Sequence, residues 1–177
     1  MFEGLFTSNE SKVHVGIVLK PHCQKPSFEG GDVIEGEVYL DVINNNFKAE
    51  NLRLLFRGGE QTLTHWTTRK DKKTHHHRKF QRREFVNISM DLASFNGSQG
   101  MSIQKTIFPF RFVLPNLLPP TIDRICGDGG WAELKYKITA SVTTPGVFWN
   151  GKVSCAQEIR VAGASSNFVL RDPGENL

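Results

Sequence analysis

The sequence predicts an all-β protein, an immunoglobulin-like antiparallel β-sandwich. Hydrophobic residues recur at every second position in many short segments, as in strands with one buried face. Clusters of Gly, Pro and Asn separate these segments, and no window of twelve or more residues keeps an apolar face at helical spacing. The chain has 177 residues, of which 38% are hydrophobic and 23% charged, and this suits a domain with its own core.

The strand pattern runs through most of the chain. Turn clusters fall at residues 21–26, 30–32, 44–46, 58–59, 96–97, 127–130, 145–146 and 150–151. Residues 91–95 come nearest to helical spacing, and we expect a turn there at most. The glycines at 127–130 precede a strand, so we interpret them as a turn and not as a phosphate-binding loop. The apolar positions that define the strands are Val13, Val15, Ile17, Leu19; Val38, Leu40, Val42; Leu52, Leu54, Phe56; Val86, Ile88, Met90; Leu134, Tyr136, Ile138, Ala140, Val142; and Val153, Cys155, Ile159, Val161.

One strand has an uncommon design. Phe108, Phe110, Phe112 and Leu114 fall at every second position, and Pro109 lies in the opposite phase. Because proline donates no ladder hydrogen bond, this strand is predicted to lie at a sheet edge or to begin irregularly. The Leu-Pro steps that follow, within residues 114–120, end the strand and favour an extended crossing.

This Pro-Phe-x-Phe strand with its Leu-Pro crossover resembles a signature of the arrestin family. Residues 31–38, 52–58 and 132–140 are similar, in the right order, to three other strands of the arrestin N-terminal domain. The resemblance covers about residues 13–161 and implies a β-sandwich of the arrestin N-domain type, whether alpha-arrestin or beta-arrestin. We therefore expect an arrestin-like N-terminal sandwich at 1–164 and, at 165–177, a connector toward a C-terminal arrestin domain that is missing here.

Positive charge is concentrated in residues 69–83. The stretch has a net charge of +7, counting Asp71, so the other 162 residues carry −3 of the formal total of +4. Like charges at this density predict an extended, mobile and solvated loop. The candidate partner-binding or anion-binding residues are its eight cations, Arg69, Lys70, Lys72, Lys73, Arg78, Lys79, Arg82 and Arg83.

Three interpretations of this stretch stay open. It is a solvated hairpin tip without a partner, a surface for a phosphorylated receptor tail, an acidic peptide or an anionic lipid headgroup, or a nucleic-acid site. Nucleic acid is not expected, because Phe80 is the one aromatic inside the stretch and single-strand binders present several stacking platforms. The arrestin resemblance implies that residues 66–80 occupy the place of the loop that probes an activated receptor. The family's phosphate-sensing lysine pair on the first strand is absent, since Thr7 and Ser8 follow Phe6.

Other chemistry has little support in the sequence. His75, His76 and His77 are consecutive within a cationic stretch that repels divalent ions, so we predict no metal site and no cofactor. Three widely spaced cysteines give neither a disulfide framework nor a metal pair. The chain has no Gly-x-Ser-x-Gly elbow, Walker loop or His-Glu-x-x-His motif, so we predict that it binds and does not catalyse.

The resemblance implies a cytosolic adaptor. Neither a membrane-spanning stretch nor a secretory signal is recognisable, so we expect a cytoplasmic location, peripheral at the plasma membrane or endosomes. The expected partners are cytoplasmic tails of membrane receptors or transporters and the trafficking or ubiquitination machinery. The alternative is an electrostatic membrane or phosphoinositide module that uses residues 69–83, with anionic lipid as its partner.

Overall fold

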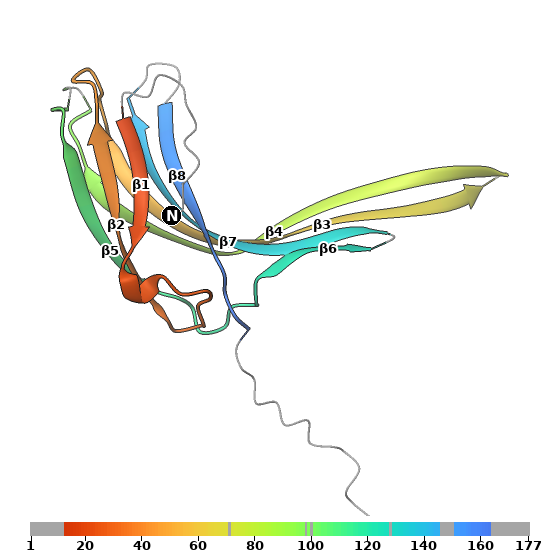
Figure 1. The fold of residues 1–177 in the computed structure, drawn as a ribbon. Coiled ribbons are helices and arrows are strands. Elements are labelled where there is room, and N and C mark those ends of the chain that lie inside the picture. Colours follow the sequence, from red (N-terminus) through yellow and green to blue (C-terminus); the bar gives the residue numbers. More distant parts are fainter. Residues whose placement is uncertain are drawn as a thin grey trace, which may run out of the picture.

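Eight β-strands make up most of the chain that the structure describes, residues 13–70, 72–97, 99, 101–127, 129–145 and 151–163 of a computed structural model (Figure 1). The helical element among these residues is a short 3-10 turn, η1, at Pro21–Cys23. The strands are β1 Val13–Leu19, β2 Val33–Val42, β3 Asn51–Lys70, β4 Lys73–Ser94, β5 Lys105–Val113, β6 Ile122–Gly127, β7 Gly130–Thr144 and β8 Gly151–Ile159.

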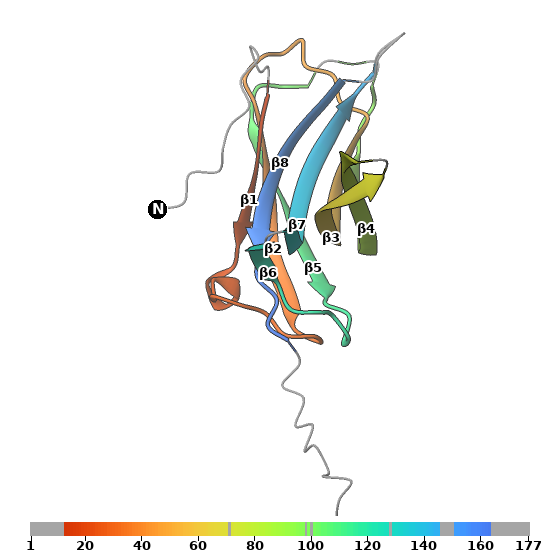
Figure 2. The ribbon, with the colours of Figure 1, turned by 90° about the vertical axis from the view of Figure 1, so that its right-hand side faces the viewer.

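The strands form two antiparallel sheets that face each other. The smaller sheet has the order β1-β2-β5, and the larger has the order β4-β3-β7-β6, with β8 also paired to β7. In Figure 2, β8, β7, β3 and β4 of the larger sheet follow one another from left to right. The predicted all-β antiparallel sandwich is therefore confirmed.

The core lies between the two sheets and is built from the alternating residues. Fully buried side chains include Val38 and Leu40 of β2, Phe56 of β3 and Tyr136 of β7. The predicted face of β7 is buried at every position from Leu134 to Val142, whereas Lys137 on the opposite phase is exposed. Strict alternation is expected of strands with one face in the core.

The aromatic strand has the place that the sequence predicts. Among the described strands β5 pairs with β2 alone and so forms a sheet edge, where Pro109 lies opposite Glu37. Phe110 and Phe112 are buried, and their rings stack with centroids 6.2 Å apart. The crossover after β5 is fastened by the Tyr136 hydroxyl, which donates to the carbonyl oxygen of Pro119 at 2.5 Å.

Two glycines allow these aromatic rings to lie flat across the sheets. Gly58 pairs with Tyr136, and an added Cβ would lie 2.5 Å from its Cε1 atom. Gly36 pairs with Phe110 in the same way, with 2.6 Å between the added Cβ and the ring. A side chain at either position would displace a buried ring.

Residues 91–94 belong to β4, which continues to Ser94 in register with β3, so the segment nearest to helical spacing contains no helix. β6, which was not predicted, pairs with the start of β7. Its side chains are all exposed, so it has no alternating pattern to detect. The connector at 165–177 and the segment around Phe6, Thr7 and Ser8 lie outside the described residues.

Candidate functional site

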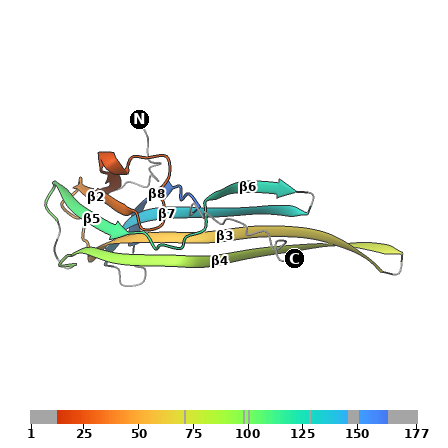
Figure 3. The same ribbon diagram turned by 90° about the horizontal axis from the view of Figure 1, so that it is seen from below.

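A long two-stranded arm carries the candidate binding residues. We define the arm as residues 60–70 of β3, Lys72 of the turn and residues 73–83 of β4; it starts at a register shift between Gly58 and Gly59. β7 accompanies β3 only as far as Thr64, so from His65 onward β3 and β4 pair with each other alone. The arm projects well away from the sandwich (Figures 1 and 3).

The loop predicted at residues 69–83 is mostly a strand. β3 continues to Lys70 and β4 begins at Lys73, and Lys72 takes a left-handed conformation with φ of 62°. Two features favour this hairpin over a disordered loop. Threonines are frequent on its β3 side and suit extended backbone, and alternation sends successive cations to opposite faces, which reduces their repulsion.

Seven of the eight cations divide into two sets by face, and Lys72 lies in the turn. Residues paired directly across an antiparallel ladder share a face, as do alternate residues of one strand. The face of Leu63 therefore carries Arg69, Arg78 and Arg82, and we call it the arginine face. The opposite face, here the lysine face, carries Lys70, Lys73, Lys79 and Arg83, and it continues the core side of the larger sheet.

Aromatic side chains accompany the cations on both faces. On the arginine face, Phe80 lies 6.2 Å from Trp131 between ring centroids, and the guanidinium of Arg124 lies 4.1 Å over the Trp131 ring. On the lysine face, Trp66 stacks on His77 at 5.2 Å. Phe80 is 55% exposed and Trp66 44%, so both rings remain available to a partner.

The histidine triplet is divided between the faces. His75 and His77 lie on the lysine face and His76 on the arginine face, because they are successive strand residues. His77 Nε2 lies 2.7 Å from the hydroxyl oxygen of Thr68. No group of three or more metal-binding side chains occurs among the described residues.

The arm's cations have no acidic partner within the described structure. None of the eight forms an ion pair with another described residue, whereas nine of the twelve other described lysines and arginines do. All eight side chains are exposed. The sandwich therefore neutralises most of its own charge, while the arm presents a concentrated positive potential to solvent.

An apolar groove of about 350 Å³ lies where the arm meets the sandwich. The crossover after β5 forms one wall, and Leu117 there is 90% exposed. Glu60 and Arg83, which are paired across the ladder, form the polar rim. The lining residues are Glu60, Arg83, Phe85, Val86, Pro115, Leu117, Leu118, Pro119 and Leu134.

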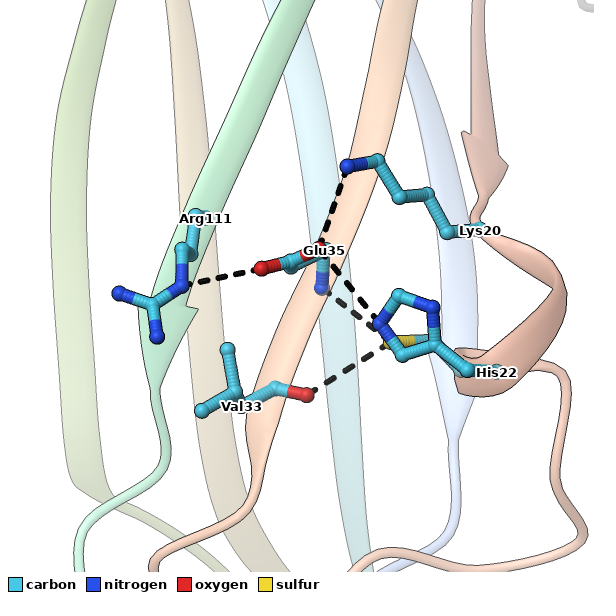
Figure 4. Close-up of polar contacts among 6 residues, drawn as sticks. Lys20, His22, Val33, Glu35 and Arg111 are labelled. Atoms are coloured by element: carbon cyan, nitrogen blue, oxygen red, sulfur yellow. Dashed lines mark hydrogen bonds and ion pairs between the residues drawn. The ribbon is translucent and has the colours of Figure 1, made fainter.

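A second polar cluster lies on the smaller sheet and has a structural role (Figure 4). The Glu35 carboxylate contacts Lys20 Nζ at 3.2 Å, Arg111 Nε at 3.0 Å and His22 Nε2 at 3.5 Å. The hydrogen bond from Lys20 is the main cause that lowers the pKa of Glu35. Buried Cys23 is held by backbone groups, since its thiol donates to the Val33 carbonyl and accepts from the Glu35 N–H. The cluster joins the segment after β1 to β2 and β5.

The comparison with known families identifies the fold. Residues 17–163 match the family described as Arrestin (or S-antigen), N-terminal domain. The chain belongs to the arrestin family. Arrestins are in general adaptors without enzymatic activity, and they generally bind receptors and trafficking machinery.

A solved structure similar to this arrestin domain is that of Spo0M, a sporulation control protein from Bacillus subtilis. It is 18% identical over 86% of this chain, with a TM-score of 0.45. The match spans 50% of the length of Spo0M. No curated protein sequence matches the chain significantly.

The structure unites all eight predicted residues on one arm and adds features that the sequence did not predict. The groove is new, because it joins residues from β3, β4, β7 and the crossover. The contact between Arg124 and Trp131 depends on β6, the strand without an alternating pattern. The sequence signal that could have indicated the groove is an apolar residue, Leu117, between two prolines of the crossover. No helix among the described residues is long and apolar enough to cross a membrane.

Proposed function

We propose that this arrestin domain is part of a non-catalytic adaptor that binds acidic or phosphorylated cytoplasmic segments of membrane receptors or transporters. By extension from the family, it would link them to trafficking or ubiquitination machinery. The observation that carries the proposal is the arm, on which eight exposed cations form no ion pair with any described residue, while most other described cations do. Such a field raises the rate of encounter with an acidic partner and favours it over neutral ones.

The arrangement of the arm supports binding of a segment and not of a small molecule. The cations lie along two faces of a long ribbon and do not converge on an enclosed cavity. Arginines offer a planar fork for carboxylate or phosphate, and three of them share one face with Phe80. An extended acidic segment can contact several of these groups at once.

A charge-matched pair of variants tests the proposal. The arm variant replaces Lys72, Lys73 and Lys79 by Gln, and the control replaces Lys48, Lys105 and Lys152, which are exposed and belong to no ion pair in the described structure. The control lysines lie near the end of β2 and the starts of β5 and β8, away from the arm (Figure 1). Both changes remove the same charge.

The assay is capture of immobilised cytoplasmic tails of receptors and transporters, with and without phosphorylation. We expect the arm variant to lose most binding and the control to keep it, and we expect binding to fall as salt increases. Equal binding by the two variants, or no capture of any tail, would argue against the adaptor function.

A second candidate is a module for anionic membrane surfaces. Exposed Trp66 and Phe80 among the cations favour it, since aromatic rings settle at the headgroup level while Lys and Arg contact anionic lipid. Each engaged cation contributes on the order of 1 kcal/mol near such a surface. Sedimentation with phosphatidylcholine vesicles, with and without phosphoinositide, tests it. If the chain sediments equally with the two vesicle types, this candidate is excluded.

A further inference from the structure

β4 offers an open edge along the whole arm. It pairs with β3 alone among the described strands, so alternate backbone N–H and C=O groups point away from the sheet. Protein edges are commonly short, bulged or covered. β4 has 22 residues, and its register shifts lie in the sandwich part near Phe85 and Leu92. Residues 73–84 therefore have a regular outer edge, on the side away from β3, with which another strand can pair.

Charge along the edge selects the kind of strand that fits. Arg78 and Arg82 flank it on one face, and Lys79 and Arg83 flank it on the other. A second copy of this arm would place like charges opposite each other, and directly opposed like charges destabilise a pair of strands. An acidic strand would gain charge pairs on both faces, so the charges disfavour self-association and favour an acidic partner.

The groove adds a requirement for one apolar residue. Arg83 and Val86 of β4 both line the groove, on the core side of the sheet. If a strand is added beside them, its side chains on that side project toward the groove. The groove is lined there by Phe85 and by exposed Leu117 of the crossover. An apolar side chain at that point would cover Leu117 and remove both from water.

We propose that an extended acidic segment of a partner protein adds to the edge of β4 as a further strand. Its acidic side chains pair with arm cations on both faces, and one apolar side chain, at the sandwich end, occupies the groove. Main-chain hydrogen bonds supply affinity, and the alternating side chains supply specificity. This inference rests on the proposed function, because it states how the arm holds the partner's segment.

Synthetic peptides test the mode of binding on the full chain. The parent peptide is a run of glutamates with a leucine near one end, prepared in both sequence orders so that either strand direction can fit. The second peptide has the same sequence with alternate backbone amides methylated, which removes strand pairing and keeps every charge. The third replaces the leucine by serine. Fluorescence anisotropy measures the affinity of each.

The matched protein variants are Leu117→Ser, which changes the groove, and Ile107→Ser, which changes an exposed apolar residue of β5 that is 53% exposed. We expect backbone methylation to weaken binding about tenfold or more. Leu117→Ser should weaken the parent peptide about three- to tenfold and leave the serine peptide unchanged. Ile107→Ser should change neither.

Equal binding of the methylated and parent peptides would overturn strand addition and leave the charge-based adaptor function standing. Binding of anionic vesicles but of no peptide would also overturn it, in favour of the membrane surface. Failure of the adaptor function itself has a different signature, namely that receptor tails are captured equally by the arm variant and its lysine control.

Discussion

Replacement of Tyr136 by Phe is expected to loosen the crossover from the larger sheet without a change in packing volume. The Tyr136 ring is fully buried, stacks on Phe56 at 5.8 Å and meets Phe85 edge-on at 5.6 Å. Its hydroxyl donates to the Pro119 carbonyl oxygen and so ties the crossover to β7. Phenylalanine keeps the ring contacts and removes only the donor.

The expected cost is that of one hydrogen bond, because Pro119 is exposed and water can reach its carbonyl oxygen in the variant. Such a bond contributes about 0.5–1.5 kcal/mol to stability. For a domain of this size, each kcal/mol lowers the melting temperature by about 2–4 °C. Because Pro119 also lines the groove, the crossover should exchange amide protons faster in the variant, and the groove should bind an apolar side chain less well.

The pH dependence provides an independent measurement. Burial raises the pKa of Tyr136 from 10.0 to about 12. The folded-state pKa exceeds the unfolded one, so the contribution of the neutral hydroxyl is complete below about pH 10 and is lost as pH rises toward 12. A shift of this size corresponds to on the order of 2–3 kcal/mol. The advantage of the wild type over Tyr136→Phe should therefore shrink through that range.

Urea unfolding of both proteins between pH 8 and pH 12 would measure this difference directly. The two proteins differ only at position 136, so the difference between their stabilities isolates the Tyr136 hydroxyl. The reasoning would be refuted by stabilities within about 0.5 kcal/mol of each other at pH 8, the range of surface substitutions. A difference that stays constant to pH 12 would show that the hydroxyl ionises alike in both states.

Three further predictions concern other parts of the fold. Gly58→Ala should cost about 1–3 kcal/mol by thermal unfolding, because the new Cβ would overlap Tyr136, whereas Gly127→Ala, with open space around it, should cost nothing. Asp32→Asn should lower stability in urea above about pH 4, and this loss should fade at lower pH. The reason is that the hydrogen bond from Lys25 lowers the pKa of Asp32, so its contribution is lost as pH falls through the folded-state pKa. Lys72→Gly should slow amide exchange in the arm by relieving about 1 kcal/mol of left-handed strain, and Lys72→Val should speed it.

The sandwich could be predicted from the sequence because burial imposes a pattern on it. Each inward strand face, such as Leu134 to Val142, must be apolar at every second residue, and this periodicity is legible without a structure. Pro109 likewise predicted that its strand lies at a sheet edge, since proline has no N–H to donate. β6 escaped detection because both of its faces are exposed, so solvent imposes no alternation on it.

The conformation of the arm could not be predicted from its charge pattern. Its charge suggested a mobile loop, yet the chain pairs residue for residue from His65 to Lys70. The repulsion between the cations was overestimated. Side chains of successive strand residues point to opposite faces, so the lysines and arginines are distributed between two faces. The charge pattern located all eight candidate residues but not their geometry, which depends on pairing between segments distant in sequence.

That geometry changes which partners the arm suits. A mobile cationic loop can bind any anionic surface, and its only requirement is charge. A paired ribbon with an open β4 edge, cations fixed on both faces and an apolar groove at its base also has requirements of spacing and backbone conformation. An extended acidic segment with an apolar residue at one end meets all of them, whereas a lipid surface meets only the first. Loss of binding on backbone methylation, with charge unchanged, is therefore the observation that distinguishes a shaped site from a charged one.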